Sequence, residues 1–216
     1  MPPDAPPLIY VIAGVNGAGK SSIQGAAIIK ANARYYNPDE AAAALRVADP
    51  VLTREAANSV AWHNGVELLK KAVKEKLNFS FESTLAGNTI PKLLRDAAHA
   101  GRQVRIWYIG LSSPELHIAR VLQRVRRGGH SIPEDVIRHR YERSQSNLID
   151  LIPHLTGLKV FDNSAEADPA EGKAPKPKLL LHLESGRILT GSHLTATPAW
   201  AKPIVAAAIK HAGEPG

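Results

Sequence analysis

The chain of 216 residues predicts an α/β fold, in which a mostly parallel sheet of five strands lies between two layers of helices. Short β-branched or aromatic segments alternate with longer amphipathic segments, which is the pattern of repeated strand–helix–strand units. A glycine-rich segment directly follows the first strand and leads at once into a helical segment. The composition, with 44% hydrophobic and 22% charged residues, is that of a globular protein.

Apolar periodicity places the elements of the main domain. Five strands are expected at 8–13, 35–37, 78–82, 103–109 and 158–161. Six helices are expected at 20–33, 39–47, 54–77, 90–100, 114–127 and 134–151. A helix between consecutive strands allows those strands to run parallel. We place this domain at residues 1–166.

The C-terminal part has a different pattern, which begins with a segment rich in proline and poor in large apolar side chains. The elements predicted there are a loop over 168–178, strands over 179–183 and 187–190, and a helix over 200–212. The turn Glu184-Ser185-Gly186 between the two strands is typical of a hairpin. We therefore expect residues 167–216 to form a linker loop, a hairpin and a helix that pack on the main domain.

Composition excludes several classes of protein. The chain has no cysteine, which rules out disulfides, thiol nucleophiles and cysteine-ligated metal sites. Its longest apolar runs, such as 8–15, are too short to span a bilayer, and the Met1-Pro2-Pro3-Asp4 start lacks the basic region of a signal peptide. We therefore expect a cytoplasmic protein that does not contact membranes. The net charge of +7 favours anionic partners, among which nucleic acid, phosphorylated metabolites and acidic proteins all qualify.

Residues 14–21 read Gly-Val-Asn-Gly-Ala-Gly-Lys-Ser, a complete phosphate-binding loop (P-loop) motif between a strand and a helix. Glycines allow backbone N–H groups to surround phosphates, Lys20 reaches the β- and γ-phosphates, and the Ser21 hydroxyl binds Mg²⁺. The expected nucleotide contacts are Gly14, Asn16, Gly17, Ala18, Gly19, Lys20, Ser21 and Ser22. The motif therefore predicts a P-loop NTPase or kinase fold with ATP and Mg²⁺ as cofactors. The alternative is a glycine-rich turn with a surface lysine.

The end of the third predicted strand carries a carboxylate and two hydroxyls, Glu82, Ser83 and Thr84. Ligands of open α/β sheets bind at the carboxyl ends of strands, so we expect these side chains to line the substrate site. Glu82 could instead cap the turn that follows. No N-K-x-D motif of GTPases, transporter-type signature or ordinary Walker B strand occurs in the chain.

Asp39 allows two interpretations. In the first, Asn37 is the N-cap of a helix, Pro38 its first residue and Glu40 the acid of a capping box, and Asp39 only complements the helix dipole. In the second, Asp39 is the base that accepts a proton from the substrate hydroxyl, since P-loop kinases place that base just after the second strand. Position alone does not decide between them.

Seven of the 14 arginines, and none of the 13 lysines, lie between His117 and Arg143. Guanidinium groups grip phosphate bidentately, so this segment could be a phosphate clamp, although a solvated helix face is the alternative. The turn at 127–133 suggests a lid around 124–143 that excludes water on closing. Arg140, Arg143 and Asn147 share one helix face, and His130 on the lid turn is a candidate substrate-side residue for direct phosphate contact.

These motifs resemble the zeta toxin-like P-loop kinases, in particular their compact, stand-alone bacterial members. The resemblance runs from about Leu8 to Ser164. It is carried by G-V-N-G-A-G-K-S, N-P-D-E, F-E-S-T-L-A-G, R-V-R-R-G-G-H-S-I-P-E-D, R-Y-E-R-S and F-D-N-S. Better-known members of this family phosphorylate the 3′-hydroxyl of the amino sugar of UDP-N-acetylglucosamine and are inhibited by an antitoxin that blocks the nucleotide site.

The resemblance implies a role for each matching residue. Lys20 and Ser21 would hold ATP and magnesium, and Asp39 would be the catalytic base. Glu82 and Thr84 would line the substrate side. The arginines that stabilise the transferring phosphate would be among Arg124, Arg127, Arg140 and Arg143, and Arg124 would also contact the nucleotide. It also implies a small-molecule substrate and an antitoxin protein as a partner.

Two other functions compete with the small-molecule kinase. The high pI suggests a polynucleotide kinase or a nucleic-acid-binding ATPase, but Trp62, Trp107 and Trp200 are far apart in the sequence, whereas base-stacking platforms need clustered rings. A protein that binds nucleotide without turnover is the other alternative.

Overall fold

The protein is described here from a computed structural model that covers residues 7–20, 34–165, 177–191 and 193–213. Its sheet has seven strands: β1 (Leu8–Ala13), β2 (Arg34–Tyr36), β3 (Phe79–Ser83), β4 (Gln103–Gly110), β5 (Gly157–Asp162), β6 (Lys178–Glu184) and β7 (Arg187–Thr190). They lie in the order β2-β3-β1-β4-β5-β6-β7, and the first five in this order are parallel. The predicted α/β fold with a mostly parallel sheet is confirmed.

The strand count of five was wrong because the C-terminal hairpin joins the sheet. Strand β6 pairs antiparallel with β5, and β7 pairs antiparallel with β6. The outer backbone groups of β5 are thereby hydrogen-bonded within the protein rather than by solvent. Sequence periodicity finds a hairpin but does not show which strand it pairs with.

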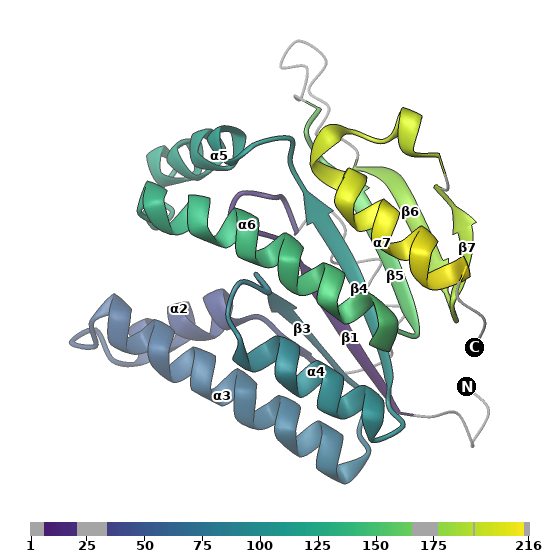
Figure 1. Ribbon diagram of the computed structural model, residues 1–216. Coiled ribbons are helices and arrows are strands. Elements are labelled where there is room, and N and C mark those ends of the chain that lie inside the picture. The colour runs from purple at the N-terminus through teal and green to yellow at the C-terminus, as the bar shows by residue number, and fades with distance from the viewer. Residues whose placement is uncertain (1–6, 21–33, 166–176, 192, 214–216) are drawn as a thin grey trace.

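The described helices are α2 (Pro38–Ala48), α3 (Arg54–Glu75), α4 (Thr89–His99), α5 (Pro114–Arg126), α6 (Glu134–Leu151) and α7 (Lys202–Gly213). Each overlaps a predicted helix, with ends that differ by at most two residues. Figure 1 shows α3, α4, α6 and α7 on one face of the sheet, with α7 over the strands of the hairpin. Residues 21–33 of the first predicted helix lie outside the described part of the chain.

Both faces of the central strands are apolar. On β1, Ile9 and Val11 belong to the large core beneath the helices, whereas Tyr10 and Ile12 belong to a second cluster on the opposite face. Burial of both faces is what parallel sheets require, and it explains why β1 reads as an unbroken apolar run. Among the described helices, none is long and apolar enough to cross a bilayer.

Trp200 fixes the C-terminal segment to the central sheet. Its ring packs over Gly110 at the end of β4, where a Cβ atom would clash with it. Trp200 is buried and joins the large core together with Ile204 and Val205 of α7. The C-terminal elements therefore share their core with the strands that carry the P-loop.

Candidate active site

The P-loop follows β1 and approaches β4 and α5 closely. A Cβ atom on Gly14 would clash with the carbonyl oxygen of Ile109, and one on Gly17 would lie 2.8 Å from the carbonyl oxygen of His117. Both glycines have positive φ values, which side chains with a Cβ rarely adopt. The Gly14 N–H donates to the Ser83 carbonyl at the end of β3. The loop is therefore a backbone cradle held by two strands and a helix.

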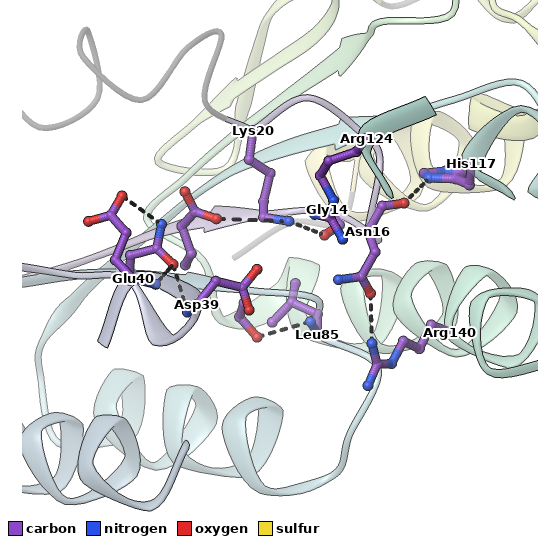
Figure 2. A network of polar contacts seen from close by, with 12 residues as sticks. Gly14, Asn16, Lys20, Asp39, Glu40, Leu85, His117, Arg124 and Arg140 are labelled. Atoms are coloured by element: carbon purple, nitrogen blue, oxygen red, sulfur yellow. Dashed lines mark hydrogen bonds and ion pairs between the residues drawn. The ribbon is translucent and has the colours of Figure 1, made fainter. Parts of the chain in front are cut away.

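Lys20 lies at the centre of the site. Its ammonium group donates to the Gly14 carbonyl at 3.0 Å and lies 3.9 Å from a carboxylate oxygen of Glu82. Burial lowers the pKa of Lys20, while the carboxylates of Glu82 and Asp39 act in the opposite direction. Figure 2 shows Lys20 directed toward Gly14, with Asp39 on the other side of the same space.

Glu82 is held from a second side by Tyr35 of β2. The Tyr35 hydroxyl donates to the Glu82 carboxylate at 2.7 Å. Burial raises the pKa of Tyr35, and the hydrogen bond to Glu82 adds to the effect, so the hydroxyl stays protonated. Glu82 is therefore an oriented carboxylate and does not cap the turn after β3.

The turn after β3 is fixed by its own hydroxyls and by α6. The Ser83 hydroxyl accepts from the Leu85 N–H at 3.0 Å, and the Thr84 carbonyl accepts from the Ser144 hydroxyl at 2.6 Å. Leu85 has a φ of +55°, a strained conformation for a residue with a side chain. Asn147 donates to the carbonyls of Leu85 and Gly87, which holds this turn in place.

Asp39 is the second residue of α2, and its helix start has the predicted cap. The Asn37 side chain accepts from the N–H groups of Asp39 and Glu40 at 2.9 and 3.4 Å, and it donates to the Glu40 carboxylate. The Asp39 carboxylate takes no part in these contacts. It lies exposed at the cavity that Lys20 also lines. The cap therefore accounts for Asn37 and Glu40 but leaves the Asp39 side chain available.

Arg140 of α6 reaches the P-loop. Its guanidinium donates to the Asn16 side-chain oxygen at 2.7 Å, as Figure 2 shows. Burial lowers the pKa of Arg140, and the Asp39 carboxylate opposes this shift. The Asn16 carbonyl accepts from His117 Nδ1 at 2.9 Å. His117 is buried, and desolvation lowers its pKa to about 4, so it is neutral at pH 7.

Arg124 and His130 contact each other across the turn between α5 and α6. The Arg124 guanidinium donates to the His130 carbonyl at 3.2 Å and lies 3.3 Å from its ring Nε2. Gly129 allows this turn, because a Cβ there would lie 2.7 Å from Arg124 Cγ. Burial and the positive charge of Arg124 lower the pKa of His130.

These side chains surround a cavity of about 590 Å³. Of the predicted site residues, it is lined by Asn16, Lys20, Asp39, Glu82, Ser83, Thr84, His130 and Arg140. The remaining walls come mainly from α3, from residues 36–38 and 87–90, and from residues 131–136 between α5 and α6 and at the start of α6. Strands β1, β2 and β3 therefore deliver the P-loop and the two carboxylates to one space at their carboxyl ends.

Other predicted residues lie elsewhere. Arg127 is exposed at the end of α5, and Arg143 donates to the Asn88 side chain at 2.7 Å instead of lining the cavity. Ser21 and Ser22 lie outside the described residues. The sequence analysis missed Tyr35, although its place four residues before Asp39 was a signal. It also missed the α3 residues that line the cavity, because their polar pattern is typical of an ordinary exposed helix face.

The arrangement suits a bound nucleotide and a metal ion. The glycines let the loop pack closely on β4 and α5 where a Cβ would clash, and Lys20 supplies the cation for phosphate oxygens. Glu82 and Asp39 offer carboxylate oxygens beside it. No group of three or more acidic or histidine side chains among the described residues could hold a metal alone. A magnesium ion here would therefore depend on oxygens of the nucleotide as well.

Comparison with known proteins places the chain in a family. The zeta toxin family model matches residues 1–168. The chain belongs to the zeta toxin family. An uncharacterised protein of Haemophilus influenzae is 34% identical over 132 residues, covering 59% of this chain and 88% of that protein.

Solved structures share the fold of this zeta toxin family member. The AvrRxo1-ORF1:ORF2 complex with ATP has a TM-score of 0.63 at 16% identity and covers 98% of this chain and 78% of its own. A structure from the PezAT toxin–antitoxin system of Streptococcus pneumoniae has a TM-score of 0.56 at 17% identity, covering 78% and 73% of the two chains. Family membership and the complete P-loop identify this protein as an ATP-dependent P-loop kinase.

Proposed function

We propose that this kinase transfers the γ-phosphoryl group of ATP to a hydroxyl of a small anionic metabolite, namely a nucleotide sugar such as UDP-N-acetylglucosamine. The observation that carries the proposal is the shared cavity, in which Asp39 lies with Lys20, Glu82 and Arg140, and its carboxylate has no hydrogen bond or ion pair among the described residues. A carboxylate beside a phosphate cradle can accept the proton of an acceptor hydroxyl. The similar AvrRxo1 structure was determined with ATP.

In the proposed reaction, Asp39 orients the acceptor hydroxyl and takes its proton. The hydroxyl oxygen forms a bond to the γ-phosphorus while the bond to the β–γ bridging oxygen breaks, and ADP leaves. Lys20 and Arg140 balance the negative charge on the transferring group. Ser21 would hold Mg²⁺, which supplies further charge neutralisation when it is bound, and Glu82 would line the substrate side.

We propose that the segment 124–143 acts as a lid over the phosphates, with contacts from Arg124, Arg127, Arg143 and His130. Arg124 and His130 already contact each other and would approach the phosphates together when the lid closes. Arg127 is exposed and Arg143 is bound to Asn88, so both would have to reorient to reach the phosphates. We further propose an antitoxin as protein partner, because a structural neighbour comes from a toxin–antitoxin system.

The test is incubation with ATP, Mg²⁺ and a panel of nucleotide sugars, followed by ADP release and product mass. We expect one acceptor to gain a phosphoryl group. Lys20→Ala should reduce the rate by orders of magnitude, because it removes the cation at the β- and γ-phosphates. Lys92→Ala, an exposed lysine of α4 paired with Asp96, is the control and should keep the full rate. ADP release without a phosphorylated acceptor, or nucleotide binding without turnover, would contradict the proposal.

A further inference from the structure

The wall of the cavity opposite the P-loop is one stripe of helix α3. Arg54, Asn58 and Trp62 follow at intervals of four residues and line the same cavity as Asp39. Residues at this spacing lie on one side of a helix. All three side chains are exposed, so they are not part of the core beneath α3.

Trp62 is unusual for its exposure. The residue is 42% exposed, whereas Trp107 and Trp200 are 8% and 7% exposed. The ring of His63 contacts it edge to face, with 4.9 Å between ring centroids. An exposed indole beside a cavity offers a flat apolar face on which a planar ring can stack.

Arg54 lies at the other end of the stripe. No hydrogen bond or ion pair of its guanidinium occurs among the described residues. Arg54 and His130 line the same cavity, and the charge of Arg54 contributes to the lowered pKa of His130. A guanidinium without a protein partner at a cavity suits phosphate oxygens.

Tyr36 fixes the position of these α3 residues relative to Asp39. The Tyr36 hydroxyl donates to the Ala61 carbonyl of α3 at 2.6 Å. Gly65 admits the Tyr36 ring, because a Cβ there would lie 2.8 Å from it. Since Tyr36 is the last residue of β2 and Asp39 follows three residues later, the position of α3 is tied to that of Asp39.

From this geometry we infer that α3 is the recognition subsite for the part of the acceptor remote from the reacting hydroxyl. Trp62 stacks on a planar heteroaromatic ring and Arg54 binds a phosphate group. Eight residues of helix span about 12 Å, so an acceptor that contacts both residues is extended and of nucleotide type. Asn58 lies between them and can hydrogen-bond a ring edge or a sugar. This inference rests on the proposed function, because it assigns specificity within the same site.

The test measures the affinity of the wild-type protein and of each variant for three probes. A saturating non-hydrolysable ATP analogue is present throughout and keeps the probes out of the P-loop. The probes are UDP-N-acetylglucosamine, uridine and N-acetylglucosamine 1-phosphate. Trp62→Ala should weaken UDP-N-acetylglucosamine about 10- to 100-fold and leave N-acetylglucosamine 1-phosphate unchanged, because only the former has a base. Arg54→Gln should weaken both phosphorylated probes and leave uridine unchanged.

Fluorescence gives a second readout that does not need turnover. Trp62 is the most exposed tryptophan, so a stacked base should quench the emission of the wild-type protein, and Trp62→Phe should abolish most of that quenching. Val60→Ala and Arg46→Gln are the controls, since both residues are exposed and neither lines the cavity. Equal weakening of all three probes by both variants would overturn the inference.

Failure of the inference is distinct from failure of the kinase proposal. If wild-type protein phosphorylates an acceptor, and both variants keep wild-type KM for that acceptor and bind the probes normally, the α3 subsite is refuted and the kinase stands. If the inference holds, both variants raise the KM for the acceptor and leave the KM for ATP unchanged. If no acceptor is phosphorylated, the probe affinities still show whether α3 is a binding subsite, because binding is measured without turnover.

Discussion

Asp39 lies in the first turn of α2, where Asn37 and Glu40 form the cap without the Asp39 side chain. A structural role of Asp39 can therefore be tested separately from its proposed role as a base. An exposed acid in the first turn of a helix contributes only about 0.3 to 1 kcal/mol to stability. A general base contributes roughly 10² to 10⁴ in rate. We predict that Asp39→Asn keeps the melting temperature within a few degrees and ATP binding intact, but loses at least about a hundredfold in kcat.

Asn37→Ala is the matched control for Asp39→Asn. It removes the oxygen that caps two backbone N–H groups of α2, which costs about 1 kcal/mol. The free energy of unfolding, measured in urea, should therefore fall more for Asn37→Ala than for Asp39→Asn. The catalytic interpretation of Asp39 is wrong if Asp39→Asn unfolds early and the folded fraction turns over at the normal rate.

His117 makes stability depend on pH. Burial lowers its pKa to about 4 in the folded protein, against 6.5 for a free histidine. The unfolded chain therefore binds more protons between these values, and His117 opposes folding increasingly as pH falls from 6.5 through 4. The total effect is about 3 kcal/mol.

We predict that His117→Asn makes the free energy of unfolding depend less on pH between 6.5 and 4, because an asparagine side chain is not protonated in this range. Its amide can still donate to the Asn16 carbonyl. Urea unfolding between pH 7 and pH 4 measures the effect as a difference between variant and wild type. His139→Gln, an exposed histidine of α6, is the control. Parallel profiles for wild type and His117→Asn would show that His117 is not buried as a neutral ring.

Residues of the site differ in how far the sequence reveals them. Lys20, Asp39 and Glu82 stand at fixed places relative to a P-loop or a strand end, and strand ends meet at one edge of a sheet. Arg54 and Trp62 carry no such signal, since an exposed helix face reads the same whether or not a cavity lies beside it. The bond between Tyr35 and Glu82 crosses 47 positions and depends on strand order.

At the scale of elements, the contact between Trp200 and Gly110 joins the C-terminal segment to β4. A side chain on Gly110 would displace the indole ring. We predict that Gly110→Ala destabilises the protein by about 1 to 3 kcal/mol, as overpacking of a core does. It should also increase the accessibility of Trp200 to acrylamide. Gly213→Ala is the control, because a Cβ there meets no other atom within 4 Å.

The elements themselves were largely predictable, whereas one of their pairings was not. Helix α3 and strand β1 have clear periodicities, so their ends agree within two residues. The hairpin of β6 and β7 is local and has a turn signal, but its pairing with β5 depends on a long connection with no sequence signature. Sequence reasoning therefore found the hairpin and missed its place in the sheet.

For the whole molecule, the shared core implies that the C-terminal part is needed for folding. Ending the chain after Ala165 removes β6, β7 and α7, and with them Trp200, Ile204 and Leu181 from the core. We predict that this shortened chain loses cooperative urea unfolding, even though it retains nearly all residues matched by the family model. A sharp transition with a midpoint near that of the full chain would instead show that residues 1–165 fold independently.

The sheet is bounded by its two shortest strands. Strand β2 has three residues and β7 has four, whereas β4 has eight. A strand at the border of a sheet exposes unpaired N–H and C=O groups to which another copy of the chain could add, and the number of such groups scales with strand length. Long apolar strands such as β1 and β4 are therefore kept in the interior. The order of the strands thus protects a protein with a strongly β-forming centre from strand-to-strand aggregation at high concentration.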